Sequence, residues 1–128
     1  MRQRQFTTKI TVHHSLASKT SMKDIMRWHV GERGFEDSGY HFLVRKSGLI
    51  EPGRDLRNVG AHKIGDNTVS VGAVFEGDFR TETPTADQYD SFNLLRTMLT
   101  KVYGPLPVEP HRRIGNKCPG KNFDFNLI

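Results

Sequence analysis

The stretch His111–Gly120 reads H-R-R-I-G-N-K-C-P-G, and we expect the fold to be organised around it. It holds the only cysteine of the chain, Cys118, seven residues after a histidine. A thiolate and imidazoles are donors that suit zinc, and a site with three protein ligands keeps a fourth position open, as catalytic zinc sites do. We therefore predict that the strand end Val12-His13-His14, near the other end of the chain, lies beside this stretch with a metal ion between them.

Six histidines are candidates for the remaining ligands. His13 and His14 are adjacent in an extended segment, so their side chains point to opposite faces and only one of them can reach the metal. His29 falls on the expected buried face of a helix, which favours a core position. From the residues alone, a His/His/Cys zinc site and a set of scattered structural histidines are equally good interpretations.

The first elements follow from alternation and capping signals. Residues 9–13 are β-branched and alternate, which indicates a strand that ends at the histidines. Ser21 stands three residues before Asp24, the spacing of a capping box, and predicts a helix over residues 22–31.

A β-hairpin is predicted next, from residues 39–45 and 49–51, with Gly48 supplying the positive φ of the turn. Residues 54–67 then form a loop punctuated by glycine, and this loop contains His62. Long loops without regular structure are often functional.

A long helix is predicted to start where Thr83 places a capping hydroxyl before Pro84, reinforced by Thr85 and Gln88. We expect it to end at about Tyr103, before Gly104-Pro105. Helical spacing predicts a buried stripe of four residues: Phe92, Leu95, Leu99 and Val102.

Residues 68–75 are the most apolar β-branched run and predict the central strand, and residues 106–110 predict a last strand that presents His111. The order β-α-β-β-β-α-β therefore predicts one α/β domain spanning residues 1–128, with a central mixed β-sheet flanked by helices. A chain of this length buries a core without disulfides. In such sheets ligands gather at strand ends and loops, where His13, Tyr40, His62 and His111 all fall.

The formal net charge is +5 and the pI is about 9.6, which favours polyanionic partners: nucleic acid, an anionic membrane surface or an acidic cell-wall polymer. A generally solvated basic surface is the simpler interpretation. The basic residues are scattered and no basic stripe with interleaved aromatics occurs, so we expect no nucleic-acid partner. No run approaches the roughly 20 apolar residues that span a bilayer, and the basic N-terminus lacks the apolar segment of a signal peptide. We expect a soluble monomer without a transmembrane segment.

Several separated motifs resemble one known family when taken in order. They are V-H-H-S, W-H, G-Y-H-F, E-P-G-R-D, V-G-A-H and H-R-R-I-G-N-K-C-P-G. Together they cover roughly residues 9–125 and resemble the zinc-dependent N-acetylmuramoyl-L-alanine amidases of the small phage endolysin type, which are similar in fold to the peptidoglycan recognition proteins. The resemblance implies hydrolysis of the amide bond between N-acetylmuramic acid and L-alanine in bacterial peptidoglycan.

By position, the resemblance implies that Zn²⁺ is held by His13, His111 and Cys118. It makes Tyr40 a catalytic residue and Lys117 the available counterpart of the family's second one. A zinc ion with an open position lowers the pKa of water to about 7, and a tyrosine hydroxyl or a lysine ammonium can donate hydrogen bonds to the oxyanion that forms.

Two departures from the family pattern concern the last loop. Arg113 stands where relatives usually carry an acidic residue. The segment between His111 and Cys118 is one residue shorter, so that Asn116 occupies the family's lysine position and Lys117 adjoins the cysteine.

Other residues receive less specific roles. His62 either contacts the substrate or helps to stabilise the oxyanion, or else it supports a ligand from behind or orders its loop. Arg112 either binds a stem-peptide carboxylate or is solvated. His14 is expected to face away from the metal. Glu51 is an acidic alternative as general base, although a pair with Arg54 is the simpler interpretation; Arg54 and Asp55 are also expected to form a pair.

Two further functions remain open from the sequence: a catalytically weak or inactive peptidoglycan-binding module of the same fold, and a cytoplasmic amidase that acts on anhydromuropeptides. The endolysin interpretation places the protein in the host cytoplasm until a separate membrane-permeabilising protein releases it to the cell wall. The retained trio of His13, His111 and Cys118 favours an enzyme over a binding module.

Overall fold

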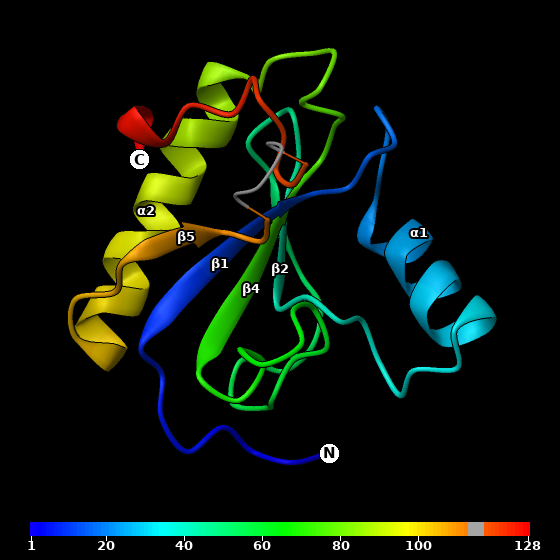
Figure 1. Cartoon of the computed structure of the whole chain (residues 1–128), viewed down its shortest axis with the longest axis vertical. Coiled ribbons are helices and arrows are strands. Elements are labelled where there is room, and N and C mark those ends of the chain that lie inside the picture. Colours follow the sequence, from blue (N-terminus) through cyan, green and yellow to red (C-terminus); the bar gives the residue numbers. More distant parts are fainter. Residues whose placement is uncertain (113–116) are drawn as a thin grey trace.

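The computed structural model describes residues 1–112 and 117–128. Its centre is a five-stranded sheet in the order β3-β2-β4-β1-β5 (Figure 1). The strands are β1 (Lys9–His14), β2 (Phe42–Val44), β3 (Ile50–Pro52), β4 (Ser70–Phe75) and β5 (Val108–Pro110). All neighbours are parallel except β2 and β3, which form the antiparallel hairpin, so the predicted mixed sheet is confirmed.

Strand β4 is central, as its composition predicted, and each of its residues is buried. It pairs with β1 from Lys9–Ser70 to His14–Phe75, and β1 pairs in turn with β5. Strands buried on both faces read as continuous apolar runs rather than alternating ones, which explains the V-G-A-V-F sequence of β4.

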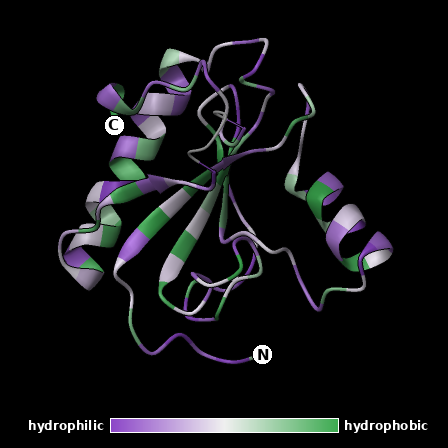
Figure 2. Ribbon diagram, in the orientation of Figure 1, coloured by the Kyte–Doolittle hydropathy of each residue, from purple (hydrophilic) through white to green (hydrophobic). Residues whose placement is uncertain are grey.

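Helix α2 (Ala86–Tyr103) covers one face of the sheet, and α1 (Met22–Met26) lies on the other side (Figure 1). The larger core cluster joins α2 to the residues of β1, β2 and β4 that point toward it, among them Ile10, Val44 and Phe75. The smaller cluster joins α1 to Leu43 and Val74 on the opposite face. Figure 2 shows apolar residues along the central strands and apolar and polar bands mixed along both helices.

The first helix begins at Ser21 with the predicted capping box to Asp24. After Met26 its turns widen into a π-helix, η1 (Arg27–Glu32), which the sequence did not indicate. The predicted strand over residues 39–45 is shorter than expected. His41 still donates its backbone N–H to the carbonyl of Gly72, and Gly39 lies against the loop that follows β3, where a Cβ would stand 2.2 Å from the carbonyl oxygen of Ala61.

The long helix corrects two predictions. Its cap is Thr85, whose side chain accepts from the backbone N–H of Gln88, while the side chain of Gln88 accepts from the backbone N–H of Thr85. Thr83 is therefore not the capping residue. Phe92, Leu95 and Leu99 are buried as predicted, but Val102 is 67% exposed. At 100° per residue Val102 lies about 80° from Phe92, at the margin of the buried arc and in the last turn.

Two predicted ion pairs of the loops are also wrong. Arg54 donates to the carbonyl oxygens of Ser38 and Val59 instead of to Glu51 or Asp55. Asp55 pairs with Arg57. An arginine that is buried beside a folded loop finds backbone carbonyls, and neighbouring residues in the sequence do not reveal that choice.

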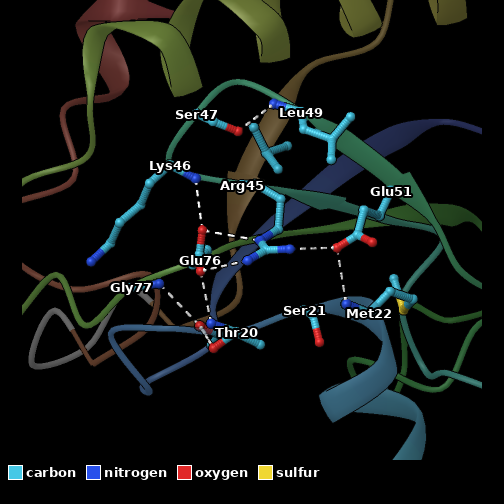
Figure 3. Close-up of polar contacts among 12 residues, drawn as sticks. Thr20, Ser21, Met22, Arg45, Lys46, Ser47, Leu49, Glu51, Glu76 and Gly77 are labelled. Atoms are coloured by element: carbon cyan, nitrogen blue, oxygen red, sulfur yellow. Dashed lines mark hydrogen bonds and ion pairs between the residues drawn. The ribbon is translucent and has the colours of Figure 1, made fainter.

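Glu76, directly after β4, is a buried hub of hydrogen bonds (Figure 3). Its carboxylate accepts from the backbone N–H groups of Thr20 and Lys46 and from the guanidinium of Arg45. Arg45 also donates to Glu51, whose same oxygen accepts from the backbone N–H of Met22. The network fastens the segment after β1 and the start of α1 to the β2–β3 hairpin.

Candidate metal centre

The three predicted ligands meet at one edge of the sheet. His13, His111 and Cys118 each offer a ligand atom, and these atoms all lie within 4.8 Å of one another. His13 is the last residue but one of β1 and is 1% exposed, whereas His111 and Cys118 are partly exposed. The arrangement is therefore one buried donor with two donors closer to solvent.

The parallel pairing of β1 and β5 brings the two histidines together. Parallel strands end at the same edge of a sheet, and the backbone N–H of His111 continues the ladder by donating to the carbonyl of Val12 at 3.0 Å. An isolated antiparallel bridge between Arg112 and Cys118, with a 2.8 Å hydrogen bond from Arg112 N–H to the carbonyl of Cys118, then returns the chain to the site. Arg113 and Asn116, the two departures from the family pattern, lie outside the described residues.

His14 points to the opposite face from His13, as expected, and holds the loop that carries the cysteine. Its Nδ1 accepts from the backbone N–H of Phe79 at 3.1 Å, so its Nε2 carries the proton and donates to the carbonyl of Lys117 at 2.9 Å. The residue immediately before Cys118 is thus fixed by the neighbour of His13.

The electrostatics of the trio suit a cation. Burial lowers the pKa of His13 well below its ordinary value, with smaller contributions from His62 and His111, and burial also lowers the pKa of His111. Burial raises the pKa of Cys118 to about 11. Without a cation these donors are neutral, and a divalent ion among them favours the thiolate. Two imidazoles and one thiolate at these separations fit zinc in its borderline-soft ligand preference.

A cleft of about 670 Å³ opens over the trio. Tyr40 and Lys117, predicted as catalytic, both line it, as does Arg112. The Tyr40 ring lies 4.9 Å from the His13 ring, centroid to centroid, and burial raises the pKa of its hydroxyl to about 12. Tyr40 therefore keeps its proton at neutral pH and can act as a hydrogen-bond donor.

The cleft is basic. Arg33 and Arg80 line it together with Arg112 and Lys117, and no carboxylate belongs to its lining among the described residues. Glu51 is not in the cleft, since it bonds Arg45 and Met22, so its candidacy as general base is wrong. No sequence motif marks Arg33 or Arg80, because basic residues scattered along the chain give no sign that these two converge on the cleft.

His62 lies behind His13 and outside the metal trio. Its Nδ1 is 2.9 Å from Nε2 of His13, and the two rings are nearly perpendicular at 84°. Burial lowers the pKa of His62 to about 3, so the ring is neutral. His29 is a core histidine as predicted, accepting from the backbone N–H of Gly39 at 2.8 Å.

No helix within residues 1–112 and 117–128 is long and apolar enough to cross a membrane.

Comparisons with known proteins point to one family. The profile of the N-acetylmuramoyl-L-alanine amidase family matches residues 3–121. An endolysin of Klebsiella phage KP32 is 42% identical over 131 residues, covering 95% of this chain and 85% of the phage protein. An endolysin of Escherichia phage T7 is 34% identical over 134 residues, covering 97% and 86%.

Solved structures agree with this result. The endolysin N-acetylmuramoyl-L-alanine amidase LysCS from Clostridium intestinale superimposes with a TM-score of 0.87 at 32% identity, covering 97% of this chain and 82% of that one. Drosophila peptidoglycan recognition protein LB superimposes with a TM-score of 0.84 at 30% identity, covering 94% and 79%. The α/β fold predicted from the sequence is therefore confirmed.

Proposed function

The chain belongs to the N-acetylmuramoyl-L-alanine amidase family, and from that premise we propose that zinc held by His13, His111 and Cys118 serves its reaction. As a member it is an amidase that cleaves the bond between N-acetylmuramic acid and L-alanine in peptidoglycan, and its relatives include phage endolysins. The observation that carries the zinc proposal is the convergence of three ligand atoms of suitable chemistry within 4.8 Å.

When bound, zinc polarises a carbonyl oxygen and makes water nucleophilic near neutral pH. The protein's contribution is to hold the scissile amide over the trio and to stabilise negative charge on its oxygen. Tyr40, protonated and lining the cleft, donates a hydrogen bond to that oxygen. Lys117 lines the same cleft and adds a positive charge from the exposed side.

The basic residues that line the cleft suit a negatively charged substrate. Stem peptides carry carboxylates, and Arg112 in the cleft is placed to bind one of them, since a guanidinium binds a carboxylate with two hydrogen bonds. Arg33 and Arg80 extend the same positive field. His62 also lines the cleft, so its predicted contact with the substrate remains part of the proposal, and its Nδ1 lies 2.9 Å from Nε2 of His13.

The remaining expectations are part of the proposal. Residues 1–128 act as one amidase domain, as a monomer, without nucleic acid and on bacterial peptidoglycan. The similarity to phage endolysins supports synthesis in a host cytoplasm followed by release to the wall through a separate protein.

The test combines metal analysis with product analysis. Cys118→Ala is expected to lose both bound zinc and lysis of peptidoglycan, while its metal-free thermal unfolding stays close to that of metal-free wild type. Mass analysis of digested murein is expected to yield lactyl-ended glycans and intact peptides that begin with L-alanine. Full lysis by zinc-free Cys118→Ala would refute the zinc proposal, and cleaved glycans would indicate a muramidase instead.

A further inference from the structure

Four groups in a row lead away from the metal centre into the protein. His13 Nε2 lies 2.9 Å from His62 Nδ1, His62 Nε2 lies 3.2 Å from the hydroxyl of Ser70, and that hydroxyl donates to the backbone carbonyl of Asp66 at 2.7 Å. His13, His62 and Ser70 are all buried, so water does not substitute for these contacts.

The last group fixes the direction of every hydrogen bond in the row. A backbone carbonyl can only accept a hydrogen bond, so the Ser70 hydroxyl donates its single proton to the carbonyl of Asp66. The Ser70 oxygen must then accept a hydrogen bond from Nε2 of His62. His62 therefore carries its proton on Nε2 and offers a bare Nδ1, which in turn accepts from Nε2–H of His13. A neutral imidazole has one N–H, so Nδ1 of His13 is left with its lone pair.

The shape of the site holds His62 in this position. A Cβ on Gly72 would stand 2.6 Å from the His62 ring, and a Cβ on Gly60 would stand equally close. The ring thus lies against two glycines that leave room for it. The backbone N–H of His62 donates to the side-chain oxygen of Asn67 at 2.8 Å, which fixes the loop on which the ring is carried.

We propose that His62, Ser70 and the carbonyl of Asp66 form a positioning relay that holds His13 as the Nε2–H tautomer and so presents its Nδ1 to the metal. The inference rests on the proposed function in that it takes His13 as a ligand. It adds which nitrogen binds, what selects it and why the loop from Gly60 to Ser70 is part of the centre. Partners behind a ligating histidine typically change metal affinity 10–100-fold when they are removed.

The first experiment needs no metal. Long-range ¹H–¹⁵N correlation spectra of the metal-free protein assign the protonated nitrogen of each histidine ring. The expected result is His13 and His62 both protonated on Nε2 and bare on Nδ1. A Nδ1–H tautomer at either ring overturns the relay, whether or not the protein later proves to bind zinc.

The second experiment compares two substitutions of similar size. In His62→Asn the amide oxygen takes the place of Nδ1 and can still accept from His13. In His62→Gln the amide takes the place of Nε2 and reaches Ser70 but not His13. Zinc titration calorimetry and the absorption spectrum of the Co²⁺ form are expected to show affinity within about threefold of wild type for Asn, and 10–100-fold weaker for Gln.

Thermal unfolding of the metal-free variants separates a positioning role from a merely structural one. Equal losses of affinity in both variants, or wild-type affinity in both, would overturn the proposal. Ser70→Ala removes the acceptor of His62 Nε2–H and is expected to give a mixture of His62 tautomers together with weaker zinc binding; a single unchanged tautomer would contradict the relay. Should wild type bind no zinc, the zinc proposal fails while the tautomer spectra still decide the relay.

Discussion

Replacing Glu76 by glutamine should cost the fold about 3 kcal/mol, because both oxygens of this buried side chain accept hydrogen bonds (Figure 3). One oxygen accepts from the backbone of Lys46 at 2.8 Å and from Arg45 at 3.1 Å, and the other accepts from the backbone of Thr20 at 2.8 Å. Glutamine has the same shape, but its NH₂ group must face donors at one of the two positions.

The magnitude follows from the bonds that are lost. Hydrogen bonds to charged groups contribute about 1.5–3 kcal/mol each, and breaking a buried pair by removing one partner costs about 3–5 kcal/mol. We use the lower end of the range of about 3–5 kcal/mol because the Arg45 side chain is 27% exposed and keeps its ion pair with Glu51. For a chain of this size about 3 kcal/mol lowers Tm by roughly 10 °C, which calorimetry or urea unfolding measures.

Glu51→Gln is the matched control. It makes the same change beside the same arginine, but the hydrogen bonds from Arg45 and Met22 both reach one oxygen, which glutamine retains. Its cost should stay below about 1 kcal/mol. Equal destabilisation by the two substitutions would refute the idea that the cost depends on whether one or both carboxylate oxygens accept hydrogen bonds.

The pH dependence of the difference provides a second check. Burial alone would raise the pKa of Glu76, but hydrogen bonds from Arg45 and from the backbone of Lys46 and Thr20 outweigh it and lower the pKa. A carboxylate with a lowered folded pKa stabilises fully above its unfolded pKa of about 4.3 and loses that contribution as the pH falls through the folded value. The gap in Tm between wild type and Glu76→Gln should therefore narrow below about pH 4 and stay constant near neutrality.

Three further predictions concern the site and the long helix. Apparent zinc affinity should rise about tenfold per unit between roughly pH 7 and 9 in metal-buffered titrations, because the Cys118 thiol, with a pKa of about 11, must lose its proton; a flat profile would argue against thiolate coordination. Lys117→Ala should lower kcat about 10²-fold with zinc content unchanged, and loss of zinc would assign the lysine a structural role. Thr85→Ala should cost about 1 kcal/mol in urea unfolding; Thr83→Ala, which removes no cap, should cost almost nothing.

Local rules predicted the elements whose determinants are themselves local. The Ser21 box, the positive φ of Gly48 and the apolar run of β4 each lie within a few residues, and each is found in the structure. The start of α2 shows the limit of such rules. Thr83 and Thr85 flank Pro84 symmetrically, and only the reciprocal bonds of Thr85 with Gln88 distinguish the true cap.

Features that depend on distant partners were predicted poorly from the residues alone. Nothing near Arg54 indicates that it donates to the carbonyl of Val59 in a folded loop. The convergence of His13, His111 and Cys118 was predicted from the ordered motifs of the family. Composition and spacing alone fitted a metal site and a set of structural histidines equally well. The support of His13 by His62 requires the loop to fold over Gly72, which no single-residue pattern encodes.

Adjacent histidines at the end of β1 show how strand alternation can serve one site from two sides. His13 turns to the face where the ligand atoms gather and is held from behind by His62. His14 turns to the other face, is fixed by the backbone of Phe79, and holds the carbonyl of Lys117. Because Lys117 directly precedes Cys118, His14 helps to set the position of the sulfur in the proposed zinc site, to which His13 would contribute a nitrogen. A substitution at His14 should therefore disturb the centre through the cysteine loop, although its own side chain points away from the metal.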